Sequence, residues 1–513
     1  MHRKHHPDSR SATPGAADRT RPRDGRLLVV SNRQPYSHDY DGDEVTVDRP
    51  TGGLTAGLDP VLQRTGGTWI AWGDGDADEA VVDEDDRVSV PPEDPTYDIK
   101  RVWLSDDQVD DYYYGYSNQV LWPLCHSALS EIRSRASFWD AYRRTNEEFA
   151  DAVLDAIESS PDRSDGDPLV WFQDYHLGLA PGMVRDRLQQ DAVLMQFWHI
   201  PWPSWDTYRC CPHAEALLRG LLGNDVLGFH VQRYRTNFFE CVEACLPDAT
   251  VERRTDEVRY DGSVTRVEAA PLGVPFDRIH RGATETSERE FDAGFRRRHG
   301  ISPDTTLAVG VDRLDYTKGI PQRLRALEHL WETRPSLRGS LTYVQNGSES
   351  RSKIDAYQRV QDEVEALVSR INDRFGTDDW RPVVFFTDQI PQEELFALYR
   401  HSDVALVSPI RDGMNLVAKE YVAAQVDGDG VLVLSDQTGA HQELGEHAVT
   451  VSPHAVDEFA DAIEGALEMP TGQRRRRMEE LRQHVAEWDL DSWLEHQFDL
   501  AATHRPLAER PQV

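Results

Sequence analysis

The segment Asp403-Val-Ala-Leu-Val-Ser-Pro-Ile-Arg-Asp-Gly-Met-Asn-Leu-Val-Ala-Lys-Glu-Tyr421 decides the fold class of this 513-residue chain. Its first half is an apolar, β-rich run, its second half consists of good helix formers, and Gly413 lies at the turn between them. The N–H groups at such a helix start attract anions, and a glycine there lets a ligand approach the backbone closely. Glu420 follows far enough into the helix to meet hydroxyls rather than phosphate. The segment indicates a sugar-nucleotide or dinucleotide site, although an ordinary βα turn has the same pattern.

Apolar and β-branched runs alternate with helical patterns along almost the whole chain, as is typical of parallel α/β sheets. We expect strands in the first half at residues 27–31, 68–72, 169–173, 192–198 and 225–229, and helices at 138–157 and 232–245. The second half restarts the pattern, with strands at 306–311, 340–345, 383–387, 403–408 and 430–434. Two successive α/β units place a ligand cleft between them, at the carboxyl ends of both sheets.

The same alternation predicts the domain limits. We expect a disordered tail over residues 1–25, because this stretch is polar and lacks the apolar core of a signal peptide. A first Rossmann-like domain should cover 26–274 and a second 275–470, with a hinge over 267–274. A helical segment over 471–505 should follow.

The charge of the chain is strongly negative, −34, with 90 acidic residues and five lysines against 51 arginines. A field of this sign repels nucleic acid and anionic lipid, so we expect neither as a partner. Adaptation to a salt-rich cytoplasm explains both the acids and the missing lysines, and an acidic mesophilic enzyme is the alternative. Lys318 and Lys419 both lie in motifs, which suggests that these lysines are kept for chemistry or binding.

Membrane spans and disulfides are not expected. No run of about 18 apolar residues exists, so a membrane helix is not supported. The five cysteines show no metal-ligand spacing, and an odd number without a secretory signal indicates reduced thiols. We therefore predict a cytoplasmic protein.

Polar side chains follow several of the expected strands. Arg313 and Lys318 come after the first strand of the second half, where an Arg fork and a Lys point charge can hold a diphosphate. Asp174 and His199 follow two neighbouring strands of the first half and suggest a sugar pocket. A surface salt bridge is the alternative role for Arg313 and Lys318, and a strand-end histidine taken alone is more often structural than catalytic.

Eight ordered segments together resemble the trehalose-6-phosphate synthase family of glycosyltransferases, from about residue 27 to about 500. They are Ser31-Asn-Arg33, Gly52-Gly53, Tyr116-Ser-Asn-Gln-Val-Leu-Trp-Pro123, Asp174-Tyr-His-Leu177, His199-Ile-Pro201, Arg313-Leu-Asp-Tyr-Thr-Lys-Gly319, Arg411 to Gln425 and Gly430 to Ser435. The resemblance implies the GT-B fold, with two Rossmann-like doubly wound domains facing a cleft and a C-terminal helix crossing back to the first domain. It also implies transfer of glucose from UDP-glucose to glucose 6-phosphate with retention.

The resemblance assigns roles to matching residues. On the acceptor side it implies contacts from Arg33, Tyr113, Trp122, Asp174 and Arg351. On the donor side it implies Gly52, Gly53, Arg313, Lys318, Gly413, Met414, Asn415, Leu416, Val417 and Glu420, the last on the ribose hydroxyls. The residues expected at the reacting centre are Asp174, His199, Arg313, Lys318 and Asp412.

The family's chemistry implies that no divalent metal or other cofactor is needed, because cations and helix N–H groups stabilise the departing UDP. A separate phosphatase would then act on the product, and a homo-oligomeric state stays open. Two departures concern the sugar side of the cleft: Gln173 stands where many family members have His, and 202–212 differs from the common pattern. Glucosyl transfer to glycerol 3-phosphate, another nucleotide on the donor, and a non-catalytic sugar-phosphate sensor therefore stay open as alternatives.

Overall fold

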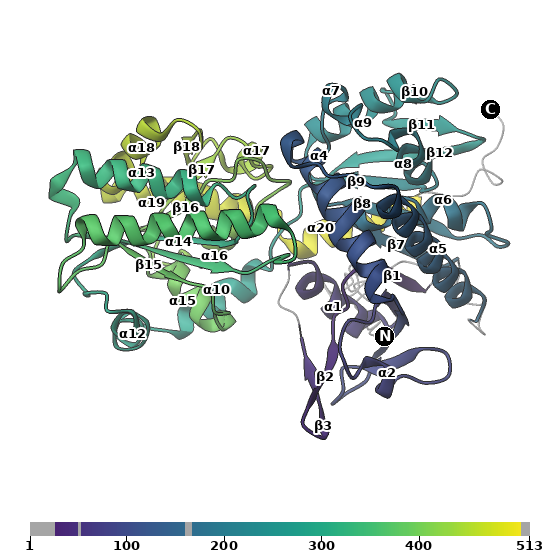
Figure 1. Ribbon diagram of the computed structural model, residues 1–513, viewed down its shortest axis with the longest axis horizontal. Helices are drawn as coiled ribbons and strands as arrows, with labels where there is room; N and C mark the ends of the chain where they lie inside the picture. The colour runs from purple at the N-terminus through teal and green to yellow at the C-terminus, as the bar shows by residue number, and fades with distance from the viewer. Residues whose placement is uncertain (1–25, 50–52, 160–166, 504–513) are drawn as a thin grey trace, which may run out of the picture.

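The computed structural model describes residues 26–49, 53–159 and 167–503. The tail predicted over 1–25 and the predicted donor residue Gly52 lie outside this range. Two lobes, each built around its own sheet, lie side by side, and the last helices pass from the second lobe back to the first (Figure 1). In the described residues, no helix combines the length and apolarity needed to span a membrane.

The first sheet is parallel at its centre and antiparallel at its edges. Its order is β10-β11-β12-β9-β8-β7-β1-β4-β6-β5, with parallel pairs from β12 through to β6. The strands are β1 (Leu27–Ser31), β4 (Thr68–Trp72), β5 (Arg87–Val90), β6 (Tyr97–Val102), β7 (Leu169–Gln173), β8 (Val193–Trp198), β9 (Val226–Phe229), β10 (Thr250–Glu252), β11 (Glu257–Tyr260) and β12 (Ser263–Ala269). The strand order reverses at β1, so the β1/β7 boundary is the point where such sheets bind ligands.

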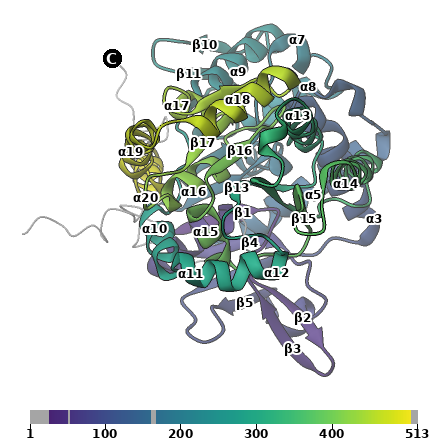
Figure 2. The ribbon, with the colours of Figure 1, turned by 90° about the vertical axis from the view of Figure 1, so that its left-hand side faces the viewer.

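Helices cover both faces of this sheet, because successive residues of β1 point to opposite sides. Leu27 and Val29 pack with α1, whereas Leu28 and Val30 pack with α5. The helical segments are α1 (Gly53–Thr65), α2 (Asp78–Val81), α3 (Asp106–Val109), the π-helix η2 (Asp110–Leu121), α4 (Trp122–Cys125), η3 (Leu129–Glu131), α5 (Ala136–Glu158), η5 (Tyr175–Leu177), α6 (Ala180–Arg185), α7 (Trp205–Tyr208), α8 (Ala214–Leu221) and α9 (Gln232–Cys245). A hairpin of β2 (Ser37–Asp41) and β3 (Glu44–Asp48) projects from the lobe (Figure 2).

The second sheet is parallel throughout, in the order β15-β14-β13-β16-β17-β18. Its strands are β13 (Thr306–Arg313), β14 (Leu341–Ser348), β15 (Val383–Phe386), β16 (Val404–Val407), β17 (Val431–Ser435) and β18 (Val449–Val451). Its helices are α10 (Phe276–Glu285), α11 (Glu288–Phe291), η6 (Asp292–Arg296), α12 (Arg297–His299), α13 (Ile320–Thr333), η7 (Pro335–Leu337), α14 (Asp355–Phe375), α15 (Gln392–Arg400), α16 (Leu416–Ala424), α17 (His441–Leu444), α18 (Val456–Glu468) and α19 (Thr471–Glu487). Here the reversal lies between β13 and β16, in the doubly wound order of dinucleotide-binding sheets.

The chain crosses between the lobes twice, at neighbouring places. After β12 it passes from the first lobe to α10, and after α19 it returns to begin α20 (Leu490–Thr503). The Leu490 N–H donates to the Val274 carbonyl at 3.0 Å, and Trp488 Nε1 donates to the Pro271 carbonyl at 2.6 Å. The predicted hinge at 267–274 is thus divided, since residues 267–269 pair with β9 inside the sheet.

Helix α20 completes the core of the first lobe. Its Trp493 ring stacks on Trp171 of β7, with 5.4 Å between ring centroids, and also meets the Phe197 ring of β8. Leu494 and Phe498 join the same buried cluster. The predicted α/β class, with two Rossmann-like doubly wound domains, is confirmed.

Candidate active site

The two strand-order reversals face a shared cavity of about 370 Å³. Asp174 and His199 enter it from the ends of β7 and β8, and Arg313 and Lys318 enter it from the end of β13. The turn between β16 and α16 closes the cavity from the second lobe. The full lining consists of Asp174, His199, His230, Leu272, Val311, Asp312, Arg313, Lys318, Asp412, Met414, Asn415, Leu416, Val417 and Glu420. Sequence reasoning therefore found most of the residues that line this cavity.

Lys318 and Asp412 form a close ion pair in the cavity. Lys318 Nζ lies 2.6 Å from Asp412 Oδ2, and Asn415 Nδ2 donates to the same oxygen at 3.1 Å. Burial opposes the charge of Asp412, but Lys318 outweighs it and holds the pKa of the carboxyl below its usual range. Asn415 has φ 82° and caps α16, its side chain accepting the Ala418 N–H at 3.1 Å. The start of α16 is thus held rigidly beside a charged pair.

Asp174 ends β7 in a left-handed backbone conformation, with φ 66°. Its Oδ1 accepts the His199 N–H at 3.2 Å, and its carbonyl accepts Gln196 Nε2 at 2.9 Å. Burial is the main cause that raises the pKa of Asp174 to about 7. A non-glycine residue with a strained backbone and a carboxyl group of raised pKa in a cavity indicates a functional position.

His199 is neutral and held by Gln173. Burial lowers the pKa of His199 to about 3. Its Nε2 lies 2.9 Å from Gln173 Oε1, which can only accept, so Nε2 carries the proton and Nδ1 is left as an acceptor. Gln173 is therefore the residue that sets the tautomer of His199. The sequence singled out Gln173 as a departure from the family pattern, without this role.

Glu420 lies one turn into α16 and lines the cavity. Burial raises its pKa to about 6, and the Tyr399 hydroxyl donates to its Oε2 at 3.3 Å. Met414, Leu416 and Val417, from the same turn and helix, add apolar surface to the lining. A carboxyl set among apolar side chains suits a flat base and a ribose diol.

The predicted acceptor residues form a second cluster that adjoins the cavity through Arg313. The Arg351 guanidinium lies over the Trp122 ring at 4.1 Å from its centroid, and Arg313 lies over the same ring at 5.4 Å. Arg33 and Tyr113 form a side-chain hydrogen bond. Burial alone would raise the pKa of Tyr113, but Arg351 and Arg33 outweigh it and lower the value to about 8. Two guanidiniums around one tyrosine hydroxyl favour a phosphate ligand.

Arg351 is positioned by buried partners. Its φ is 50°, its Nη2 donates to the Tyr175 hydroxyl at 3.1 Å and its Nη1 donates to the Tyr357 hydroxyl at 2.5 Å. Asp315, fully buried, lies 3.6 Å from Arg351 and 3.9 Å from Arg313. Asp315 is thus a carboxylate shared by two cations, and its place in the motif that holds Arg313 could have identified it.

Several predicted residues lie apart from the cavity lining. Gly53 begins α1, and Gly413 packs against the His199 main chain, where an added Cβ would lie 2.2 Å from the carbonyl oxygen. Lys419 is buried: its Nζ donates to the Leu272 carbonyl at 2.8 Å and pairs with Glu443 at 2.8 Å. The expectation that Lys419 serves chemistry or binding is corrected, because its charge is used to fasten α16 to the interlobe crossing.

His230 was missed by the sequence reasoning. It follows β9, lines the cavity and lies with its ring centroid 5.4 Å from that of His199. The Leu272 N–H donates to its Nδ1 at 3.3 Å. The strand-end rule that found Asp174 and His199 would also have found His230.

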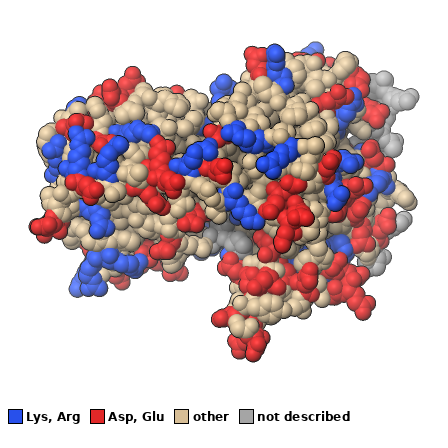
Figure 3. Space-filling model, viewed as in Figure 1, with Lys and Arg blue, Asp and Glu red and all other residues tan. Residues whose placement is uncertain are grey.

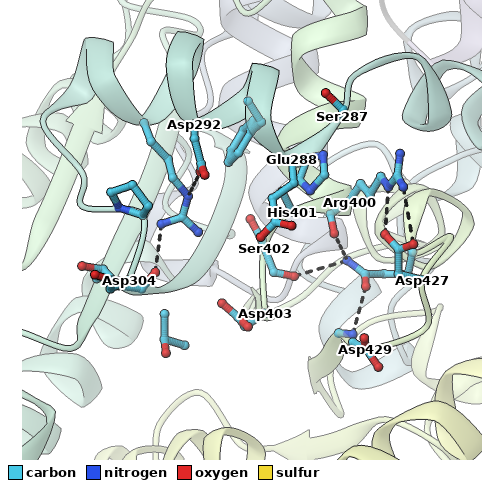
Figure 4. Close-up of a pocket in the computed structure, with 17 residues that line it drawn as sticks. Ser287, Glu288, Asp292, Asp304, Arg400, His401, Ser402, Asp403, Asp427 and Asp429 are labelled. Atoms are coloured by element: carbon cyan, nitrogen blue, oxygen red, sulfur yellow. Dashed lines mark hydrogen bonds and ion pairs between the residues drawn. The ribbon is translucent and has the colours of Figure 1, made fainter.

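A larger cavity, of about 510 Å³, lies at the opposite, amino ends of β13, β16 and β17 (Figure 4). Acidic residues dominate its wall, among them Asp304, Asp403, Asp427 and Asp429. The amino ends of parallel strands are not where such sheets bind substrates. Over the ranges that the structure describes, no group of three or more His, Cys, Asp or Glu could hold a metal ion.

Comparison with known proteins identifies relatives along nearly the whole chain. The sequence model of glycosyltransferase family 20 matches residues 25–503. The trehalose-6-phosphate synthase of Mycobacterium avium (strain 104) is 36% identical over 488 residues, which cover 94% of this chain and 96% of the relative.

Solved structures agree with the sequence comparison. A structure from E. coli bound with UDP-2-fluoro glucose superposes with a TM-score of 0.81 at 32% identity, covering 93% of this chain and 99% of the other. An α,α-trehalose-phosphate synthase (UDP-forming) from Burkholderia xenovorans, in complex with glucose-6-phosphate, gives a TM-score of 0.80 at 30% identity, covering 93% and 100%.

Proposed function

This chain belongs to glycosyltransferase family 20, and from that premise we propose that it transfers glucose from UDP-glucose to glucose 6-phosphate, giving α,α-trehalose 6-phosphate and UDP. The transfer retains the anomeric configuration. The observation that carries the proposal is that two cationic clusters adjoin: Arg313 and Lys318 line the cavity, and Arg313 shares the Trp122 ring with Arg351 of the neighbouring cluster, which also holds Arg33. A reaction between two phosphorylated sugars needs two such clusters.

The donor is proposed to lie along the second lobe. The N–H groups at the start of α16, together with Arg313 and Lys318, suit the diphosphate. Glu420 suits the ribose hydroxyls, and Asp174 and His199 suit hydroxyls of the transferred glucose. Lys318 already pairs with Asp412, so the arriving diphosphate would share this cation with the carboxylate.

The acceptor is proposed to lie between Asp174 and the cluster of Arg33, Tyr113 and Arg351. Its phosphate would lie between the two guanidiniums, and the Tyr113 hydroxyl would donate to it. The Trp122 ring supports the cluster, because the guanidiniums of both Arg313 and Arg351 stack on it.

The chemical step breaks the bond between C1 of glucose and the β-phosphate oxygen and forms a bond from C1 to the acceptor hydroxyl oxygen. The bonding electrons leave with UDP, whose β-phosphate oxygen takes the acceptor's proton on the same face of the sugar. Charge therefore grows on the diphosphate, where Arg313 and Lys318 stabilise it most in the transition state. Closure of the lobes would keep water from the donor.

The finer parts of the sequence predictions stay proposals. We propose that the transfer needs no divalent metal, that it takes place in the cytoplasm and that a separate phosphatase acts on the product. The oligomeric state stays open. The domain limits at 26–274, 275–470 and 471–505 also stay proposals: the crossing after β12 supports the first limit, whereas the return crossing follows α19 and lies within the third segment, and residues 504–505 lie outside the described range.

Product analysis tests the proposal. The purified protein would be incubated in molar KCl with UDP-glucose and either glucose 6-phosphate or glycerol 3-phosphate, with and without EDTA, and the products identified by mass and NMR. A non-reducing α,α-1,1 disaccharide phosphate that forms equally with EDTA is the expected result. UDP release only with glycerol 3-phosphate would show that the acceptor is not glucose 6-phosphate. Loss of activity in EDTA would contradict the proposal that no divalent metal is needed. Nucleotide binding without turnover would favour a non-catalytic sensor.

A further inference from the structure

A second, smaller cavity of about 240 Å³ lies between the lobes and shares no lining residue with the catalytic cavity. From the first lobe it is lined by Asn118, Gln119, Glu131, Arg133 and Arg135, and from the second by Tyr316, residues 353–356 and Arg359. Four cations reach it, namely Arg133, Arg135, Lys353 and Arg359. Figure 3 shows Lys and Arg side chains gathered where the two lobes meet.

The positive charge of this cavity is only partly neutralised. Arg359 pairs with Glu131 at 2.7 Å and Lys353 pairs with Asp110 at 2.8 Å, both across the lobes. Among the described residues, no ion pair joins Arg133 or Arg135 to a carboxylate. Asp355 is the remaining acid of the wall. In a chain with 90 acidic residues, two arginines left without a carboxylate beside a cavity indicate a place for an external anion.

Backbone groups add to this charge. Helix α14 has 21 residues and begins at Asp355 on the cavity wall, with no side-chain cap on its first N–H groups. Arg133 is held in place by its own backbone surroundings, since its Nη1 donates to the carbonyls of Ser130 and Ile132 at 2.8 and 2.9 Å. The guanidinium therefore needs little reordering to meet a ligand.

We propose that this cavity binds a small phosphate-bearing anion, which bridges the two lobes. The chemistry fits a free phosphate or a phosphate monoester, because guanidinium forks and helix N–H groups both suit phosphate oxygens. Arg133 and Arg135 hold the anion from the first lobe, and Lys353 and the start of α14 hold it from the second. An anion bound by both lobes favours their closed arrangement.

The cavity also contacts the residues that hold Arg351. Asn118 Oδ1 accepts the Tyr175 hydroxyl at 2.8 Å, and Tyr175 in turn accepts Arg351 Nη2. On the other wall, the Ile354 N–H donates to the Arg351 carbonyl at 2.9 Å. Occupation of the cavity therefore steadies the proposed acceptor site, and this consequence, unlike the binding itself, rests on the proposed function.

Direct binding in the Arg33→Ala background tests the site, because that substitution weakens phosphate binding at the acceptor cluster. Equilibrium dialysis with inorganic phosphate, with saturating UDP to occupy the proposed diphosphate site and at one KCl concentration that keeps every variant folded by circular dichroism, should give one bound equivalent in R33A. Adding R133Q and R135Q should weaken this binding at least ~tenfold, as two charge-assisted contacts are lost. The matched control R143Q/R144Q removes the same charge from exposed positions of α5 and should bind as R33A does.

Equal phosphate binding in the R133Q/R135Q variant and its control would overturn the proposal, as would the absence of binding in R33A. Ribose 5-phosphate, measured in parallel, distinguishes the two sources: tighter binding than inorganic phosphate identifies a monoester site, and weaker binding a free-phosphate site. The measurement involves no turnover, so its failure would leave the proposed transfer reaction untouched.

Discussion

Gln173 Oε1 lies 2.9 Å from His199 Nε2, and this contact determines which nitrogen of His199 carries the proton. The imidazole is neutral because burial lowers its pKa to about 3, so its Nδ1 is available as a hydrogen-bond acceptor. A glutamine at this place provides an oxygen without a charge. The chemistry of His199 therefore depends on the neutrality of its neighbour.

Replacing Gln173 with Glu should make activity depend on pH through His199. A buried carboxylate beside the ring favours the imidazolium and raises its pKa toward neutrality. Since the imidazolium cannot accept a hydroxyl hydrogen bond at Nδ1, kcat/KM for UDP-glucose should fall about tenfold between pH 8 and pH 6, over and above any fall in the wild type. The control Q173M, which removes the contact without adding charge, should lower activity equally at both pH values. Parallel profiles for wild type and Q173E would contradict the role given to Gln173.

Replacing Arg313 with Ala should reduce turnover at least about a hundredfold, because it removes a charge-assisted contact that strengthens as UDP departs (on the order of 3 kcal/mol). Steady-state kinetics at saturating UDP-glucose would measure this fall in kcat. The control is R297A, at an exposed position of α12 in the same lobe, which should keep wild-type turnover. Unchanged kcat in R313A would remove Arg313 from the diphosphate site.

Binding of the phosphorylated acceptor should weaken as pH rises through about 8. The two guanidiniums lower the pKa of Tyr113 to about 8, so above this pH the residue becomes a phenolate that competes with the phosphate dianion for Arg33 and Arg351. KM for glucose 6-phosphate should rise between pH 7.5 and 9 in the wild type. Y113F lacks the ionisation, so its KM should be higher at pH 7.5 and nearly flat. An identical rise in Y113F would assign the effect to another group.

Adding a methyl group at Gly413 should disturb the contact between the lobes. The Cβ of an alanine would lie 2.2 Å from the His199 carbonyl oxygen. Because the two atoms would overlap, the main chain at residue 413 or at His199 would have to move. Displacement of about 1 Å in a catalytic pair costs roughly a hundredfold in rate, and we expect kcat/KM of G413A to fall by that order. G465A, where nothing lies within 4 Å of the new Cβ in α18, should keep full activity and equal or higher Tm. Wild-type kinetics in G413A would show that the lobes separate during turnover.

The stability of the fold should depend on the salt concentration. Acidic side chains gather over the first lobe, around α2 and the β2–β3 hairpin (Figure 3), and self-repulsion among them grows as screening is withdrawn. Circular dichroism should show loss of folded signal below about 0.5 M KCl. Full helical signal in salt-free buffer would refute adaptation to high salt and favour an acidic mesophilic protein.

The strands of both sheets were largely predictable from sequence, because buried parallel strands are nearly continuous apolar runs. Residues 27–31, 68–72 and 169–173 match β1, β4 and β7. β13 continues two residues past the predicted end, to Arg313, since pairing with β14 persists after the apolar pattern stops. Among the strands of the two sheets, β5, β6, β10, β11, β12 and β18 were not predicted, because each is short or carries polar or charged residues that interrupt the apolar run.

The site was predictable where a residue directly follows a strand, and less so where tertiary contacts decide. Asp174, His199 and Arg313 lie where parallel strands end, which local sequence shows. Lys419 looked functional from its motif, but its Nζ contacts Leu272, almost 150 positions earlier, and no local pattern encodes such a pairing. The Arg351 guanidinium likewise contacts Tyr175, Tyr357 and Asp315, which come from both lobes, and no local pattern encodes these contacts.

Helix α20 has a consequence for how the protein is made. During translation the first lobe leaves the ribosome long before Trp493, whose ring covers Trp171 and Phe197 in the finished structure. That face of the nascent sheet stays exposed while the second lobe is synthesised, because residues 490–503, which cover it, are translated afterwards. The first lobe therefore completes its core only after the second lobe has been made, which reverses the usual order in which an N-terminal domain matures first.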